Sequence, residues 1–220
     1  MPQYTLVIGN KNYSSWSLRA WLLMQHSRIT FEEVRVPLYV AGYKDVLRKY
    51  APSGKVPALV DGGFVVWDSL AIAEYLAERH PDRQLWPADS VQRAVARSIS
   101  AEMHSGFAAL RSKMTMNCRG SFPGVGRTVE VAADIERIQR IWSDCRERFG
   151  AAGPYLFEAF TIADAMYAPV VLRFKTYAVQ LTPAARQYAD AILALPALQE
   201  WIEAARAETE VIRAFEPATP

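Results

Sequence analysis

Two periodicities of apolar residues succeed one another at the start of the chain. Residues 4–8 form an apolar run that indicates a buried strand, and residues 15–27 carry apolar side chains on almost every helical face, which is typical of a buried helix. Val34, Val36 and Leu38 then alternate with other residues and predict a second strand. A strand, a helix and a strand in this order predict a right-handed parallel crossover.

The following segments change the predicted sheet from parallel to mixed. A short helical segment at 43–50 precedes two β-rich runs, at 56–60 and 64–67, which are separated by the hairpin signal Asp-Gly-Gly. Residues 69–80 return to helical spacing and stop before a proline. The predicted order βαβαββα with a mixed four-stranded sheet is the thioredoxin-like arrangement, and we assign it to a domain of residues 1–80.

Strand signals end at the linker of residues 80–87, so we expect a second domain that is all-α and spans residues 88–220. Asp89, with Gln92 three residues later, predicts the start of a helical stretch that reaches about Met116. Further helices are predicted near residues 131–149, from 161 onward, and near 183–193 and 196–208.

Two of these helices carry the clearest signals. Six residues spaced 4-3-4-3-4 place one buried face on a helix that stops at Gly150; they are Val131, Ile135, Ile138, Trp142, Cys145 and Phe149. Thr161 and Asp164 have the spacing of a capping box, and Pro169 should kink the helix that they begin.

Composition narrows the function classes without selecting one. The 220 residues are 51% hydrophobic and 22% charged with a net charge of +2, and the charges are mixed, so we expect neither nucleic-acid binding nor disorder. No secretion signal and no apolar run of about 18 residues is present, so we expect a cytoplasmic protein with no membrane partner. Cys118 and Cys145 are isolated, which disfavours a disulfide scaffold, a zinc site and dithiol redox chemistry.

Three serines gather where the first strand hands over to the first helix: Ser14, Ser15 and Ser17. Backbone N–H groups and the positive end of the helix dipole point outward at such a helix start, so an anion such as a thiolate is favoured there. A serine that only caps the helix explains the same pattern. Spacing alone leaves both interpretations open.

Two further segments offer groups for a peptide ligand. Pro57 cannot donate to a sheet, so Lys55-Val56-Pro57 marks a strand start or edge in the trans form, or, if the bond is cis, turns the backbone of Val56 toward the serines. Asp68-Ser69 at the start of the third helix suits an α-amino acid head group, although Asp68 as an ordinary N-cap is an equal alternative.

In this order the motifs resemble those of the soluble glutathione transferases. Residues 13–19, Tyr-Ser-Ser-Trp-Ser-Leu-Arg, are similar to the serine-type active-site turn of the zeta and tau classes, with arginine five residues after the first serine. Residues 55–57 resemble the cis-proline motif of that family, residues 68–69 its γ-glutamyl-binding pair, and residues 161–164 the capping box of its helical domain. The resemblance covers nearly the whole chain.

The resemblance implies glutathione as co-substrate and a homodimer, and we expect no metal. It makes Ser14 the best candidate for the catalytic hydroxyl, with Ser15 as the adjacent alternative. The residues that it implies for holding glutathione are Trp16, Lys55, Val56, Pro57, Asp68 and Ser69.

The implied activity is glutathione transfer to small apolar electrophiles. One alternative is a glutathione-dependent isomerase of the maleylacetoacetate type, which Trp16 disfavours because those isomerases carry cysteine at the matching place. No cysteine lies near the turn, so deglutathionylation through a protein mixed disulfide is not expected. The other alternative is a non-catalytic binding or scaffold protein, which would need neither Ser14 nor the two peptide-binding segments.

The second substrate should bind between the domains, on the helical stretch that follows Asp89. Its candidate residues are Met103, His104, Phe107 and Arg111. For the apolar stripe of Met103, Phe107 and Met114, interdomain core is the favoured explanation, whereas His104 and Arg111 stay open. Asn117, Arg119 and the loop at 120–126 are candidates for the rim of the same pocket.

Overall fold

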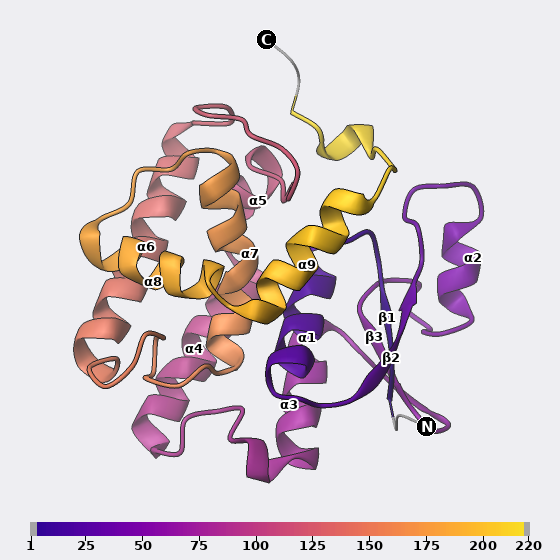
Figure 1. The fold of residues 1–220 in the computed structure, drawn as a ribbon, viewed down its shortest axis with the longest axis horizontal. Coiled ribbons are helices and arrows are strands. Elements are labelled where there is room, and N and C mark those ends of the chain that lie inside the picture. Colours follow the sequence, from indigo (N-terminus) through magenta and orange to yellow (C-terminus); the bar gives the residue numbers. More distant parts are fainter. Residues whose placement is uncertain (1–3, 218–220) are drawn as a thin grey trace.

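The computed structural model describes residues 4–217, and its first third is a sheet with helices packed against it (Figure 1). Its elements are β1 (Tyr4–Ile8), α1 (Ser15–His26), β2 (Phe31–Arg35), α2 (Tyr43–Arg48), β3 (Ala58–Asp61), β4 (Phe64–Trp67) and α3 (Ser69–Arg79). The strand order is β2-β1-β3-β4, with β1 parallel to β2 and antiparallel to β3. The predicted mixed sheet and its βαβαββα order are confirmed.

The second strand begins and ends three residues before its predicted position. Its register pairs Phe31 with Tyr4 and Arg35 with Ile8, and Val36 adds only a backbone hydrogen bond of 2.9 Å to the carbonyl of Ile8. Because β2 is an edge strand, it tolerates the exposed charges of Glu32 and Glu33. These charged residues interrupt the apolar alternation, so the alternation does not mark the start of the strand.

The rest of the described chain is helical, as expected. After a 3₁₀ turn at Pro81–Arg83 come α4 (Ser90–Ser105), α5 (Ala108–Lys113), α6 (Val129–Phe149), α7 (Ile162–Thr176), α8 (Pro183–Leu193) and α9 (Pro196–Ala207), followed by a 3₁₀ turn at Arg213–Phe215. Asp89 caps α4 as predicted, because its carboxylate accepts the N–H groups of Val91 and Gln92.

The stretch from Asp89 to Met116 is two helices and not one. Gly106 is extended and Phe107 has a positive φ of 57°, so the chain turns between α4 and α5. A Cβ atom on Gly106 would lie 2.8 Å from the carbonyl oxygen of Glu102, which explains why glycine suits this position.

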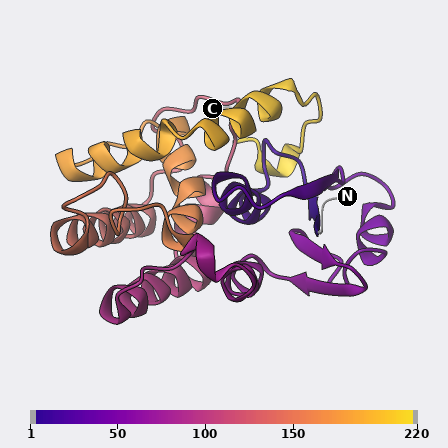
Figure 2. The same cartoon turned by 60° about the horizontal axis from the view of Figure 1, so that its bottom comes forward.

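Helix α1 lies between the sheet and the helical layer, as Figure 2 shows. It packs against α3 on one side and against α7 and α9 on the other. This placement explains why its sequence is apolar on almost every face: Leu18, Leu22 and Leu23 have no exposed surface. The buried face predicted for α6 is confirmed as well, since Val131, Ile138 and Trp142 are fully buried.

The capping box at the start of α7 is present and buried. The carboxylate of Asp164, which has no exposed surface, accepts the N–H groups of Thr161 at 2.8 Å and Leu156 at 3.2 Å. Burial raises the pKa of Asp164 to about 6, although these hydrogen bonds oppose the shift. Pro169 lies inside α7, which continues across it to Thr176.

The cysteines, possible metal ligands and apolar helices of the described chain bear on its function. Cys118 and Cys145 are free, and burial raises the pKa of both thiols to about 12. Among residues 4–217, no three His, Cys, Asp or Glu side chains come together in a group that can hold a metal ion. Within the same residues, none of the helices combines the length and apolar character that a membrane span requires.

Candidate functional site

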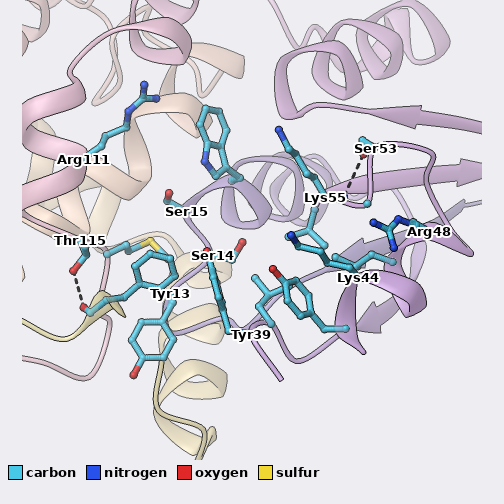
Figure 3. Close-up of a pocket in the computed structure, with 18 of the residues that line it drawn as sticks. Tyr13, Ser14, Ser15, Tyr39, Lys44, Arg48, Ser53, Lys55, Arg111 and Thr115 are labelled. Atoms are coloured by element: carbon cyan, nitrogen blue, oxygen red, sulfur yellow. Dashed lines mark hydrogen bonds between the residues drawn. The ribbon is translucent and has the colours of Figure 1, made fainter. Parts of the chain in front are cut away.

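A cavity of about 700 Å³ opens between the sheet domain and the helices (Figure 3). The β1–α1 turn forms its floor, α2 and the segment before β3 form one wall, and α5 with the C-terminal segment forms the other. Five of its described lining residues are basic and none is acidic; the basic ones are Lys44, Arg48, Lys55, Arg111 and Arg173. The cavity therefore favours anionic ligands.

Ser14 lies on this floor as the N-cap of α1. Its oxygen accepts the N–H of Ser17 at 3.3 Å, and its hydroxyl donates to the Ser17 oxygen at 2.7 Å. Ser17 has no exposed surface and is fixed by the Gly9 N–H, which donates to its oxygen at 3.0 Å. Ser14 thus fulfils the capping interpretation and, being 7% exposed and part of the lining, stays accessible to a ligand.

Ser15 faces the same cavity and is held from the other domain. The guanidinium of Arg173, on α7, donates to the Ser15 oxygen at 3.2 Å and to the Met114 carbonyl at 2.8 Å. Burial and the nearby Arg111 lower the pKa of Arg173 to about 10, so it stays cationic at neutral pH. A positive charge therefore lies directly behind the serine turn.

Two more guanidinium groups pack against the indole ring of Trp16. The Cζ atoms of Arg19 and Arg111 lie 4.4 and 5.3 Å from the indole centroid, within the range of cation–π contacts. Burial, followed by the charges of Arg173 and Arg111, lowers the pKa of Arg19 to about 9. Trp16 lines the cavity and shields the Arg19 cation from solvent.

The opposite wall carries the lysines and the proline motif. Lys44 and Arg48 come from α2, and Lys55 and Val56 precede β3 (Figure 3). The Val56-Pro57 bond is cis, the form that the resemblance indicated and that base rates for X-Pro bonds disfavour. Pro57 is buried behind Val56 and is not part of the lining.

Asp68 and Ser69 lie at the start of α3, outside the lining of the cavity. Asp68 caps α3 through the N–H groups of Leu70 and Ala71, but it has a positive φ of 78°, a strained conformation for a residue with a side chain. Its other carboxylate oxygen lies 3.1 Å from Nε2 of His104, whose ring contacts Trp16. The Ser69 hydroxyl is buried without a hydrogen-bond partner among the described residues.

The residues predicted for the second substrate separate into two groups. Met103 and Phe107 are buried in the core and do not line the cavity, in agreement with the core interpretation of that stripe. Arg111 lines the cavity, and His104 lies behind Trp16. Asn117 and Arg119 bind the C-terminal segment instead of the cavity.

The structure adds lining residues that sequence reasoning missed, among them Tyr39, Thr115, Met116, Arg173 and Phe215. One of them had a readable signal: Arg173 is a charged residue inside the apolar run of α7, where it is only 4% exposed. A buried arginine in such a run indicates that its guanidinium group forms specific hydrogen bonds or ion pairs in the interior. Phe215 had no comparable signal.

Comparison with known proteins decides the family. The profile of the glutathione S-transferase N-terminal domain matches residues 13–79, and that of the C-terminal domain matches residues 128–204. A probable maleylacetoacetate isomerase from Caenorhabditis elegans is 31% identical over 172 residues, covering 77% of this chain and 78% of the relative. The chain belongs to the glutathione S-transferase family. It is accordingly a glutathione-dependent enzyme of that family.

Other members of the family match in part or in fold. A zeta-class glutathione S-transferase from Euphorbia esula is 32% identical over 108 residues, covering 49% of this chain and 48% of the relative. A crystal structure of a Burkholderia glutathione transferase homologue with bound glutathione superposes with a TM-score of 0.68 at 24% identity, covering 93% of this chain and 98% of that one. The zeta-class resemblance and the two-domain transferase fold are confirmed.

Proposed function

We propose that this glutathione S-transferase binds glutathione across the serine turn and activates its thiol at Ser14. The observation that carries the proposal is the position of Ser14 at the positive end of α1, in a cavity whose described lining is basic and contains no acidic residue. A thiolate is stabilised by each of these features.

The charges of the site suit the charges of the tripeptide. Glutathione carries a carboxylate at each end and an ammonium group at the γ-glutamyl end. Lys44, Arg48 and Lys55 are placed to bind the glycine carboxylate, while the backbone of Val56 pairs with the cysteinyl segment. For the γ-glutamyl end we propose Asp68 and Ser69, at the start of α3 beside the lining of the cavity. The Asp68 carboxylate, on a side chain that is 43% exposed, binds the ammonium group in place of His104, and the buried Ser69 hydroxyl turns toward the second carboxylate.

The energy required to activate the thiol is within reach of these groups. Lowering a thiol pKa from about 8.5 by two units requires about 2.7 kcal/mol of preference for the thiolate. A hydrogen bond to a charged acceptor supplies about 1.5 to 3 kcal/mol and a helix N-terminus about 0.3 to 1 kcal/mol. Ser14 therefore acts as a hydrogen-bond donor and keeps its proton.

Ser17 is placed to support this donation. In the structure the Ser14 hydroxyl donates to the Ser17 oxygen at 2.7 Å. When the Ser14 proton turns to the sulfur, the Ser17 hydroxyl can donate to the Ser14 oxygen in its place, because a hydroxyl is both donor and acceptor. The Gly9 N–H holds the Ser17 oxygen in position throughout.

We name the part of the cavity beside α5 and the C-terminal segment the electrophile side. It combines apolar surface with positive charge. Trp16, Met116 and Phe215 line it together with Arg111. We therefore propose an electrophile with an apolar body and a carboxylate, a narrower class than the apolar electrophiles expected from sequence.

A glutathione-dependent isomerase is the second candidate, and the cationic pair Arg111 and Arg173 favours it. Relatives are named maleylacetoacetate isomerases, and the substrate in that name is an unsaturated dicarboxylic acid. The thiolate would add to the conjugated C=C bond and leave an enolate, rotation about the resulting single bond would follow, and loss of the thiolate would restore the double bond. No atom is gained or lost.

Titration calorimetry tests the binding proposal. We expect glutathione to bind at millimolar concentration or below and Cys-Gly, which lacks the γ-glutamyl group, to bind about tenfold or more weaker, because it loses the contacts to Asp68 and Ser69. Absence of binding at millimolar glutathione would favour a scaffold protein. Equal affinity for both peptides would remove the role of α3.

Arg111→Gln tests the electrophile class. We expect kcat/KM for a carboxylate-bearing electrophile such as maleylacetone to fall about tenfold or more, because a charge-assisted hydrogen bond is lost, while a neutral aryl halide changes less than about threefold. Arg137→Gln is the matched control, since Arg137 is 46% exposed and pairs with Glu102 on the surface. Equal losses with both electrophiles would assign Arg111 a structural role.

We also propose a homodimer, supported by large apolar side chains on the exposed edge strand β4. Phe64 is 57% and Trp67 47% exposed, and side chains of this size at a sheet edge are usually covered. Light scattering coupled to size exclusion should give twice the mass of one chain, and Phe64→Glu should shift it toward the monomer. A monomeric wild-type protein would contradict the proposal.

A further inference from the structure

His104, near the end of α4, contacts two residues that we propose for the glutathione site. Its Nε2 atom lies 3.1 Å from Oδ2 of Asp68, and its ring lies edge-on to the indole of Trp16 with the centroids 5.2 Å apart. An ionised carboxylate only accepts hydrogen bonds, so Nε2 carries the proton of the contact with Asp68. The histidine therefore donates to the group that we propose for the ammonium of glutathione.

The two carboxylate oxygens of Asp68 have separate partners. Oδ1 accepts the N–H groups of Leu70 at 2.9 Å and Ala71 at 3.3 Å, and these bonds cap α3. Oδ2 pairs with His104. Because the Asp68 side chain is 43% exposed, a ligand can reach it from solvent. An ammonium group that binds Asp68 and leaves the cap of α3 intact therefore competes with His104 for Oδ2.

The backbone of His104 is held independently of this ion pair. The guanidinium of Arg111 donates to the His104 carbonyl at 3.0 Å and to the Met103 carbonyl at 3.4 Å. The second ring nitrogen, Nδ1, is buried without a hydrogen-bond partner within residues 4–217. A ligand that displaces the ring from Asp68 therefore breaks one polar contact of the side chain and leaves the end of α4 in place.

Charged groups from three other helices face the pair: Asp68 from α3, Arg19 from α1 and Arg111 from α5. Burial lowers the pKa of Arg19 to about 9, and the nearby charge of Asp68 opposes this shift. Arg19 therefore stays cationic at neutral pH, with its Cζ atom 4.4 Å from the centroid of the Trp16 indole. Among these types of side chain, histidine is the one whose charge ordinarily changes between pH 6 and pH 7.5.

We propose that His104 is an affinity-determining residue of the glutathione site, because it competes with the γ-glutamyl ammonium group for Oδ2 of Asp68. The imidazolium form holds the carboxylate more strongly than the neutral ring, since its hydrogen bond is charge-assisted on both sides. Affinity for glutathione therefore decreases as the pH is lowered. The proposal rests on the proposed function, because it assumes that Asp68 binds the ammonium group.

Titration calorimetry of His104→Phe tests the competition, since phenylalanine keeps a ring beside Trp16 and cannot pair with Asp68. We expect the variant to bind glutathione about threefold more tightly than the wild type at pH 6 and less than about twofold more tightly at pH 7.5, the range expected for an ion pair of partly exposed groups. The ratio of the two proteins at each pH cancels the ionisation of the peptide and of the buried Asp164, whose pKa is about 6.

A second peptide and two further variants serve as controls. Glutaryl-Cys-Gly lacks only the ammonium group of glutathione, so His104→Phe should not bind it more tightly than the wild type does. His80→Phe is the matched variant, because His80 contacts the Tyr4 hydroxyl at 3.0 Å and does not line the cavity. It should leave the affinity for glutathione unchanged at both pH values. His104→Gln keeps a donor without a charge, so its affinity at pH 6 should lie between those of the wild type and His104→Phe.

Unchanged or weaker binding of glutathione by His104→Phe at pH 6 would overturn the proposal. An equal gain for glutaryl-Cys-Gly would also overturn it, because the effect would then be independent of the ammonium group, and so would the same gain in His80→Phe. Wild-type protein that binds neither peptide would overturn the proposed function together with this proposal. Wild-type protein that binds glutathione, combined with an unchanged affinity in His104→Phe, overturns this proposal alone.

Discussion

The Ser14→Ala variant is expected to lose between ten- and about a hundredfold in kcat/KM and to raise the pKa of bound glutathione by about one to two units. The reason is the loss of one hydrogen bond to the thiolate, while the helix dipole and the basic lining of the cavity remain. Thiolate absorbance in the ultraviolet, followed against pH, measures the pKa directly, and steady-state kinetics measure the rate.

Two variants separate this effect from the capping role of Ser14. Thr128 caps α6, because its hydroxyl oxygen accepts the N–H of Val131 at 3.3 Å. Thr128→Ala should therefore lower stability about as much as Ser14→Ala does, without changing the thiol pKa. Ser15→Ala removes the hydroxyl that Arg173 holds. If Ser15→Ala shifts the thiol pKa and Ser14→Ala does not, the donor is Ser15.

The Asp164→Ala variant is expected to lower the free energy of unfolding by about 3 to 5 kcal/mol. Its carboxylate accepts two backbone N–H groups, of Thr161 and Leu156, and the Thr161 hydroxyl, all in the interior. Removing it leaves buried donors without a partner, and each such donor costs about 1 to 3 kcal/mol. Urea unfolding followed by far-ultraviolet circular dichroism measures the change.

We attribute this large loss of stability to the burial of Asp164. A second helix cap in the chain, which is exposed, tests this explanation. Asp89 also accepts two backbone N–H groups, at the exposed start of α4, so Asp89→Ala should cost only about 0.5 to 2 kcal/mol. Asp164→Asn keeps an acceptor oxygen and should lie between the two. Equal losses in Asp164→Ala and Asp89→Ala would show that burial does not amplify the effect.

Local pattern was sufficient for most of the fold. Residues close together in sequence determine several features that the structure has: the apolar faces of α1 and α6, the hairpin between β3 and β4, and the caps at Asp89 and Thr161. Where the local pattern failed, strand pairing or backbone conformation determined the structure. The start of β2 depends on its pairing with β1, and the break at Gly106 and Phe107 depends on a single backbone conformation.

The candidate site divides in the same way. The serine turn and the proline motif are short segments, so their residues were found in advance and line one cavity. Arg173 and Phe215 reach that cavity from more than 150 residues after the serine turn, and no local spacing predicts such a meeting. The role of Trp16 was also open, because only the structure shows the guanidinium groups of Arg19 and Arg111 against its indole.

Helix α1 belongs to the sheet domain by sequence, yet it packs against α7 and α9. As a result, buried side chains from both halves, such as Leu22 and Trp142, fall within one continuous apolar cluster. A boundary near residue 80 therefore separates two kinds of secondary structure without separating two interiors. Excision of either half would open half of a shared core to water, so denaturation should proceed as one concerted event.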